Sequence, residues 1–161
     1  MAEKIENQQI EQNEKSAIDI IRELADNCRW EDALEQLELL EEKYPDNPDV
    51  LYEFARIYFE LGNYPTSISY YENLIELHET PVMYFNLGMA YEANDEKDRA
   101  ISNYLKCLAI NPKFSFAYKK LGTLFMARGD NEDAKEYFTD YLTFDVSADE
   151  AEDIKKIIER L

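Results

Sequence analysis

Residues 81–114 read PVMYFNLGMAYEANDEKDRAISNYLKCLAINPKF and show the helical pattern of this chain most clearly. In the first half of this stretch Tyr84, Leu87 and Tyr91 lie three, four and seven residues apart, which places them on one face of an α-helix. A second helical pattern follows and closes at Pro112, a residue that helices do not extend through. The stretch therefore predicts two consecutive helices joined by a turn.

The same slots recur along the chain. Gly88 and Gly122 are 34 residues apart, and Pro45 and Pro112 are 67 apart, which is one step of 33 and one of 34. Repetition at such a period is typical of repeat proteins. Aligned on this step, the chain divides into four units and a tail: 14–47, 48–80, 81–114, 115–148 and 149–161.

The recurring slots identify a family. In the third unit they read Tyr84, Leu87, Gly88, Tyr91, Ala100, Tyr104 and Pro112. This order resembles the tetratricopeptide repeat, and the resemblance covers residues 14–148. It departs from the family where Val146 replaces the proline of the fourth unit and where the first unit begins. The resemblance implies an all-α fold, a right-handed α-solenoid of four helix–turn–helix repeats plus a C-terminal capping helix.

The glycines divide between two roles. Gly88 and Gly122 lie inside helical patterns, opposite small alanines, and predict a close approach of paired helices. Gly62 and Gly129 follow helical patterns and predict left-handed residues that end helices. No segment shows the period-two alternation of a strand.

The two ends of the array differ. Ser147 opens residues 149–161 with the spacing of a capping box, and an apolar stripe follows, so we expect a helix that covers the last repeat. Residues 1–13 are polar, and we expect a mobile arm, with a partner-binding or self-association segment as the alternative.

Composition excludes several classes of protein. The chain has 161 residues with 35 acidic and 17 basic side chains, a formal net charge of −18, which disfavours nucleic acid and anionic membranes as partners. Cys28 and Cys107 stand far apart, and neither a zinc motif nor a disulfide framework is present. No apolar run is long enough to span a bilayer and no secretory signal is recognisable, so we expect a cytoplasmic protein.

No catalytic constellation is recognisable. His78 is the only histidine, nucleophile motifs and phosphate-binding glycine loops are absent, and the carboxylates lack the spacing of a calcium loop. We therefore expect neither an enzyme nor a bound cofactor, metal or small-molecule substrate. Cys107 falls in an apolar slot and is expected to be a core residue, whereas Cys28 lies in a turn.

The family resemblance implies a binding groove formed by the first helix of each repeat. The groove slots carry basic and aromatic side chains, although the chain is acidic overall. The candidate residues are Arg22, Tyr52, Arg56, Phe59, Phe85, Asn86, Met89, Phe116, Lys119, Lys120 and Thr123. For Phe59, Phe85 and Phe116 the alternative is that they only fill space between adjacent repeats.

These features predict a non-catalytic protein-interaction module, an adaptor, assembly factor or chaperone. We expect it to be a monomer that binds a partner peptide with apolar anchors and acidic groups. The alternatives are a structural repeat protein that associates with itself and a small bacterial secretion-type chaperone. A heat-shock co-chaperone is less favoured, because the slots of that family's carboxylate clamp read Tyr52, Arg56, Asn86, Phe116 and Lys120 here, and only Asn86 is identical to the clamp residue.

Overall fold

The computed structural model describes residues 17–161, and in that range the chain forms helices joined by short turns. The chain divides into two compact units, of which the first ends at His78 and the second spans Glu79–Leu161. The expectation for the arm of residues 1–13 falls outside the described residues.

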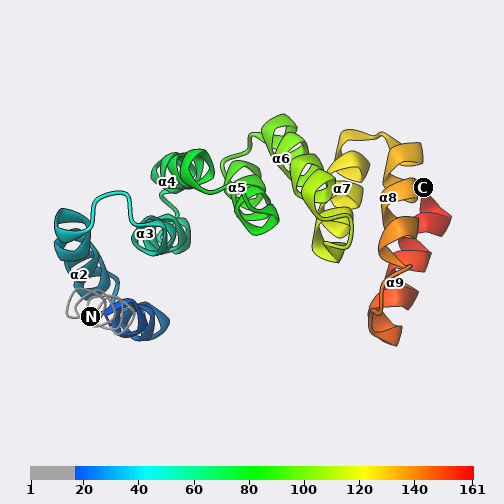
Figure 1. The fold of residues 1–161 in the computed structure, drawn as a ribbon. Coiled ribbons are helices and arrows are strands. Elements are labelled where there is room, and N and C mark those ends of the chain that lie inside the picture. The colour runs from blue at the N-terminus through cyan, green and yellow to red at the C-terminus, as the bar shows by residue number, and fades with distance from the viewer. Residues whose placement is uncertain (1–16) are drawn as a thin grey trace, which may run out of the picture. The chain divides into compact units, whose positions relative to one another are not determined.

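The first unit contains two helix–turn–helix pairs (Figure 1). Its helical segments are residues 17–26, α2 (Trp30–Lys43), α3 (Pro48–Glu60) and α4 (Tyr64–Leu77). Helix α3 packs against α4 and also against α2. One buried cluster joins the two repeats, because Ile21 and Leu37 of the first pair lie in the same cluster as Phe54 and Ile57 of α3.

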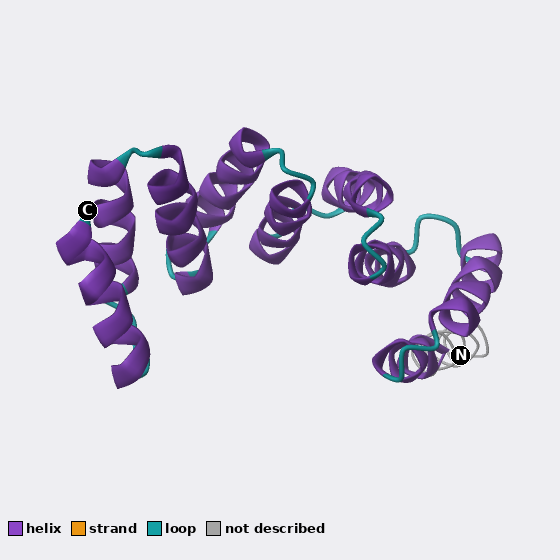
Figure 2. Ribbon diagram, turned by 180° about the vertical axis from the view of Figure 1, so that it is seen from behind, coloured by secondary structure: helices purple, strands orange, loops and turns teal. Residues whose placement is uncertain are grey.

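The second unit contains two further pairs and a single final helix (Figure 2). Its helices are α5 (Pro81–Ala93), α6 (Lys97–Ile110), α7 (Ser115–Arg128), α8 (Asn131–Tyr141) and α9 (Ala148–Arg160). Helix α5 pairs with α6 and α7 with α8, while α9 packs on α8 and buries Ile154. The predicted all-α class of helix–turn–helix repeats followed by a capping helix is confirmed.

Local sequence signals start several of these helices. The side chains of Asn47, Asn63, Thr80 and Ser147 each accept a hydrogen bond from a backbone N–H in the first turn of the helix that follows. Such caps satisfy donors that have no partner within the helix. Helices α3, α4 and α5 also carry proline in the first turn, where its missing N–H is harmless.

The turn inside each helix pair is the same in all four pairs. Gly62 and Gly129 have φ values of +74° and +88°, as predicted. The equivalent positions in the other two pairs hold Cys28 and Asp95, with φ values of 57° and 60°. In each turn the residue after the left-handed one donates to a carbonyl five residues back, as between Asp130 N and Phe125 O at 3.0 Å. The first and third repeats thus form the turn without glycine.

The helix glycines face aromatic rings. A Cβ on Gly88 would lie 2.7 Å from Tyr104 Cε1, and a Cβ on Gly122 would lie 2.7 Å from Phe138 Cδ1. The predicted close approach of the paired helices is present, and the atoms nearest each glycine belong to an aromatic ring of the second helix.

Candidate functional site

The candidate groove residues are shared between the two units. The first unit holds Arg22, Tyr52, Arg56 and Phe59. The second unit holds Phe85, Asn86, Met89, Phe116, Lys119, Lys120 and Thr123. The structure brings most of the second set together around one pocket and two of the first set together around one carboxylate.

The pocket of the second unit lies between α5 and α7, the first helices of consecutive repeats. Its volume is about 270 Å³. The residues that line it are Phe85, Phe116, Lys119, Lys120 and Thr123, all of which the sequence analysis selected. Asn86 and Met89 lie on α5 but are not among the lining residues. We refer to this site as the Phe116 pocket.

The two phenylalanines of the Phe116 pocket differ in how they are held. The ring of Phe85 packs against Tyr104 and Phe114, with centroid distances of 5.4 and 4.9 Å, and forms a fixed wall. Phe116 is 62% exposed, an unusual exposure for so large an apolar side chain. Phe85 therefore has a packing role, whereas Phe116 offers apolar surface to another molecule.

Both lysines of the pocket have carboxylate partners within the chain. Lys119 Nζ lies 2.6 Å from Glu150 Oε1 on α9, and Lys120 Nζ lies 3.0 Å from Glu92 Oε2 on α5. Lys119 and Tyr141 both hydrogen-bond the Glu150 carboxylate and lower its pKa, and burial together with that carboxylate raises the pKa of Tyr141 to about 12. The two cations were predicted from the sequence, but their carboxylate partners were not.

Glu92 also accepts a hydrogen bond from the buried Tyr104. The Tyr104 hydroxyl lies 2.7 Å from Glu92 Oε2, the same oxygen that Lys120 approaches. Burial, followed by this hydrogen bond, raises the pKa of Tyr104. The hydrogen bond from the buried Tyr104 therefore fixes the position of the Glu92 carboxylate that Lys120 contacts.

In the first unit, two of the candidate residues meet at a buried acid. Glu53 is fully buried, accepting from Arg22 Nε at 2.6 Å and from Arg56 Nε at 2.8 Å. Asp26 Oδ1 lies 3.7 Å from Arg56 Nη1, and Asp19 Oδ1 lies 3.6 Å from Arg22 Nη1. Arg22 and Arg56 are thus neutralised within the chain, and Glu53 raises the pKa of Arg22 chiefly through its hydrogen bond. Glu53 lies three residues before Arg56, and this helical spacing was the signal for the pair available in the sequence.

The remaining aromatic candidates of the first unit contact rings of the paired helix. Tyr52 lies edge-on to Tyr71 at 6.2 Å, and Phe59 lies 5.5 Å from Tyr64. These contacts support the packing alternative for Phe59.

The thiols differ in their surroundings. Cys107 is buried, and burial raises its pKa to about 11, which suppresses the reactive thiolate. Cys28 is exposed in its left-handed turn. Within residues 17–161 no group of acidic, histidine or cysteine side chains is arranged to hold a metal ion.

Comparison with known proteins identifies the repeats. Two family models, both described as tetratricopeptide repeat, match residues 18–74 and 82–114, which together make up more than half of the chain. The chain belongs to the tetratricopeptide repeat family. Proteins built from these repeats mediate protein–protein interactions, and the helix pairs above are the repeats.

Curated proteins with similar sequences include an assembly protein and a heat shock protein. The photosystem I assembly protein Ycf3 of Synechococcus sp. WH7803 is 35% identical over 72 residues, 42% of this chain and 42% of Ycf3. The heat shock protein STI1 of Saccharomyces cerevisiae is 30% identical over 91 residues, 55% of this chain and 15% of STI1. The matched regions thus span less than half the length of these relatives.

Solved structures share the fold. MamA superposes with a TM-score of 0.74 and 24% identity, over 80% of this chain and 76% of MamA. TTC0263, a tetratricopeptide repeat protein of Thermus thermophilus, superposes with a TM-score of 0.66 and 19% sequence identity, over 82% of this chain and 74% of TTC0263. In the part of this repeat protein that the structure describes, no helix is long and apolar enough to cross a membrane.

Proposed function

We propose that this tetratricopeptide repeat protein is a non-catalytic adaptor, assembly factor or chaperone that binds a segment of a partner protein in the Phe116 pocket. The observation that carries the proposal is a pocket of about 270 Å³ that combines an exposed phenylalanine with two lysines. Aromatic side chains at the centre of a contact supply most of its binding energy, and cations at its edge select charge.

The pocket favours a ligand with one apolar side chain and a nearby carboxylate. The apolar side chain packs between Phe85 and Phe116. The carboxylate takes the place of Glu92 or Glu150 at Lys120 or Lys119, whose partners are already at 3.0 and 2.6 Å. Binding is therefore an exchange of one ion pair for another, which selects for charge while adding little to affinity.

An assembly role draws support from the relatives. Ycf3 is described as an assembly protein, and its similarity to this chain covers 42% of each. The free thiols Cys28 and Cys107 suit a reducing compartment, and we propose a cytoplasmic monomer. The match to STI1 gives a heat-shock co-chaperone function some support, but Arg56 of the clamp slots is held by Glu53.

Differential capture from a source-cell lysate tests the proposal. Phe116→Ser and Lys120→Glu remove the apolar and the cationic half of the pocket, and each should lower recovery of the same partner. Lys97→Glu is the charge-matched control, because Lys97 is an exposed residue in the first turn of α6, where an acid is tolerated. Equal recovery by wild type and both pocket variants would contradict the proposal.

A further inference from the structure

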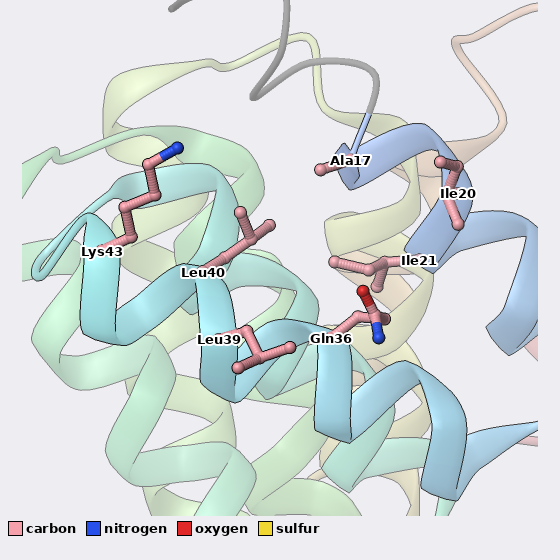
Figure 3. A pocket seen from close by; sticks show the side chains of 7 residues that line it. All are labelled: Ala17, Ile20, Ile21, Gln36, Leu39, Leu40 and Lys43. Carbon is pink, nitrogen blue, oxygen red and sulfur yellow. The ribbon is translucent and has the colours of Figure 1, made fainter.

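A second hollow lies on the first unit, formed by helical residues 17–26 and α2. Its volume is about 210 Å³. The lining residues are Ala17, Ile20, Ile21, Gln36, Leu39, Leu40 and Lys43, which Figure 3 shows on facing helices. We refer to it as the Leu39 hollow. None of its residues belongs to the candidate groove.

The Leu39 hollow is apolar at its rim and continuous with the core at its floor. Ile20 is 52% exposed and Leu39 is 57% exposed. Ile21 is fully buried in the core cluster of the first unit, and Leu40 packs against that cluster. A ligand seated here would extend the core and remove two large aliphatic side chains from water.

The repeat alignment explains why Ile20 is exposed. The equivalent residues of the other three repeats, Phe54, Leu87 and Leu121, are all buried. Phe54 is buried in the core cluster that the first repeat shares with the second, so this slot faces the preceding repeat. Ile20 stands in the first repeat, and in the described part of the first unit no helix covers it. Because helices of the preceding repeat cover the equivalent Phe54, a helix is the ligand that we expect to cover Ile20.

Leu39 departs from the pattern of its own slot. The equivalent residues of the later repeats are Asn73, Lys106 and Asp140, all polar. The first repeat thus carries an exposed leucine where the others carry solvent-facing polar groups. This additional apolar residue lies next to the slot that lacks a covering helix.

Acidic residues flank the exposed aliphatic residues of the hollow on both helices. Glu35 and Glu42 lie four residues before and three residues after Leu39 on α2, and Glu23 lies three residues after Ile20, so each shares a helix face with an exposed aliphatic residue. Within residues 17–161 these three carboxylates form no ion pair. The hollow contributes one cation, Lys43, whose ammonium lies 4.9 Å from the Tyr44 ring centroid.

Charge distinguishes between the possible occupants. A second copy of the chain carries a net charge of −18 and would set acid against acid. Residues 1–16 hold four acidic and two basic side chains and therefore also carry a net negative charge. A basic partner complements the rim.

We propose that the Leu39 hollow docks an amphipathic helix of a partner protein, with two aliphatic side chains one turn apart and flanking lysine or arginine residues. The aliphatic pair packs on Ile20 and Leu39, and the basic flanks approach Glu23, Glu35 and Glu42. This site takes a basic helix, whereas the Phe116 pocket takes an acidic segment.

Selection from a phage-displayed library of amphipathic helices about 18 residues long tests the proposal, with the full chain as bait. Clones are counter-selected on an Ile20→Ser/Leu39→Ser double variant, and the recovered helices are measured by fluorescence anisotropy. We expect paired aliphatic residues with basic flanks, and binding at least about tenfold weaker to Leu39→Ser and to Glu35→Lys/Glu42→Lys. Leu77→Ser, which removes a similarly exposed leucine of the same unit, and Phe116→Ser should leave binding unchanged.

Three results would overturn the proposal. The first is a selection that yields no basic helices, or one in which no basic helix survives the counter-selection on the double variant. The second is sedimentation velocity that shows a dimer which Leu39→Ser dissociates, because a second copy then covers the hollow. The third is binding that requires removal of residues 1–16, which would assign the hollow to the chain's own segment. Circular dichroism of each variant establishes that it is folded.

Discussion

Arg22 donates from Nε to Glu53 Oε1 across 2.6 Å and so links the first helical segment to α3, 31 residues further along the chain. Glu53 is fully buried and accepts from Arg56 as well, so two cations depend on one carboxylate. A buried acid with two guanidinium partners connects the first two repeats by charge as well as by packing.

Removing the Glu53 charge should destabilise the first unit. Glu53→Gln removes the buried negative charge and places an NH2 donor against one of the two guanidinium groups, which bond different oxygens of Glu53. We expect this to lower the free energy of unfolding by about 2–4 kcal/mol. The loss falls below that of a fully buried pair because both arginines keep partial access to water. Urea denaturation measures it, with Glu60→Gln at an exposed site of the same helix as the control. Equal midpoints for the two variants would show that the Glu53 cluster contributes no stability.

The turn residues provide a stabilising substitution. Asp95 adopts the left-handed conformation that Gly62 and Gly129 adopt at no steric cost. Asp95→Gly should therefore raise the free energy of unfolding by about 0.5–1 kcal/mol, and Gly129→Ala should lower it by about 1 kcal/mol. Thermal denaturation of the two variants against wild type measures both signs. Shifts in the same direction would contradict this account of the turn.

Adding one methyl group at Gly122 should also destabilise the chain. Its Cβ would lie 2.7 Å from the buried Phe138 ring, and overpacking of this kind costs about 1–3 kcal/mol. In a double variant with Phe138→Leu the ring is absent, so the cost of Gly122→Ala should shrink. A double-mutant cycle in urea measures the coupling. Strict additivity would mean that the ring does not require the glycine.

The α9 helix should be sensitive to acid. Lys119 and Tyr141 hold the pKa of Glu150 below its ordinary value, so the stabilisation is complete above the unfolded pKa and is lost as pH falls through the lower folded value. We expect the protection factors of the α9 amides, which are corrected for the intrinsic pH dependence of exchange, to fall below about pH 4. Glu150→Gln should show reduced protection already at neutral pH, with little further change in acid. Glu152→Gln, an exposed acid of the same helix, should keep the wild-type profile.

The sequence predicted the elements of the fold well, because helical periodicity and scarce residues mark them locally. The glycines at 62 and 129 indicated left-handed turns, yet the same turn at Cys28 and Asp95 left no sign, since hydrogen bonds impose it on residues that do not prefer it. The pattern also did not predict that the aromatic rings of Tyr104 and Phe138 would lie nearest to Gly88 and Gly122.

The candidate site was predicted by position but not by charge pairing. Slots inferred from the family include every residue that lines the Phe116 pocket. The partners of its lysines could not be predicted, because Glu92 and Glu150 lie 28 and 31 residues away and meet Lys120 and Lys119 only when the helices stack. Long-range ion pairs depend on helix register, which a single sequence does not encode locally.

Binding of a partner segment in the Phe116 pocket can be measured residue by residue by mapping amide chemical shifts. An isotope-labelled chain is titrated with the acidic segment of the partner recovered by wild-type capture. We expect the largest shift changes at Phe85, Phe116, Lys119 and Lys120, and their loss in Phe116→Ser. Changes confined to other helices, with these residues unmoved, would contradict this expectation.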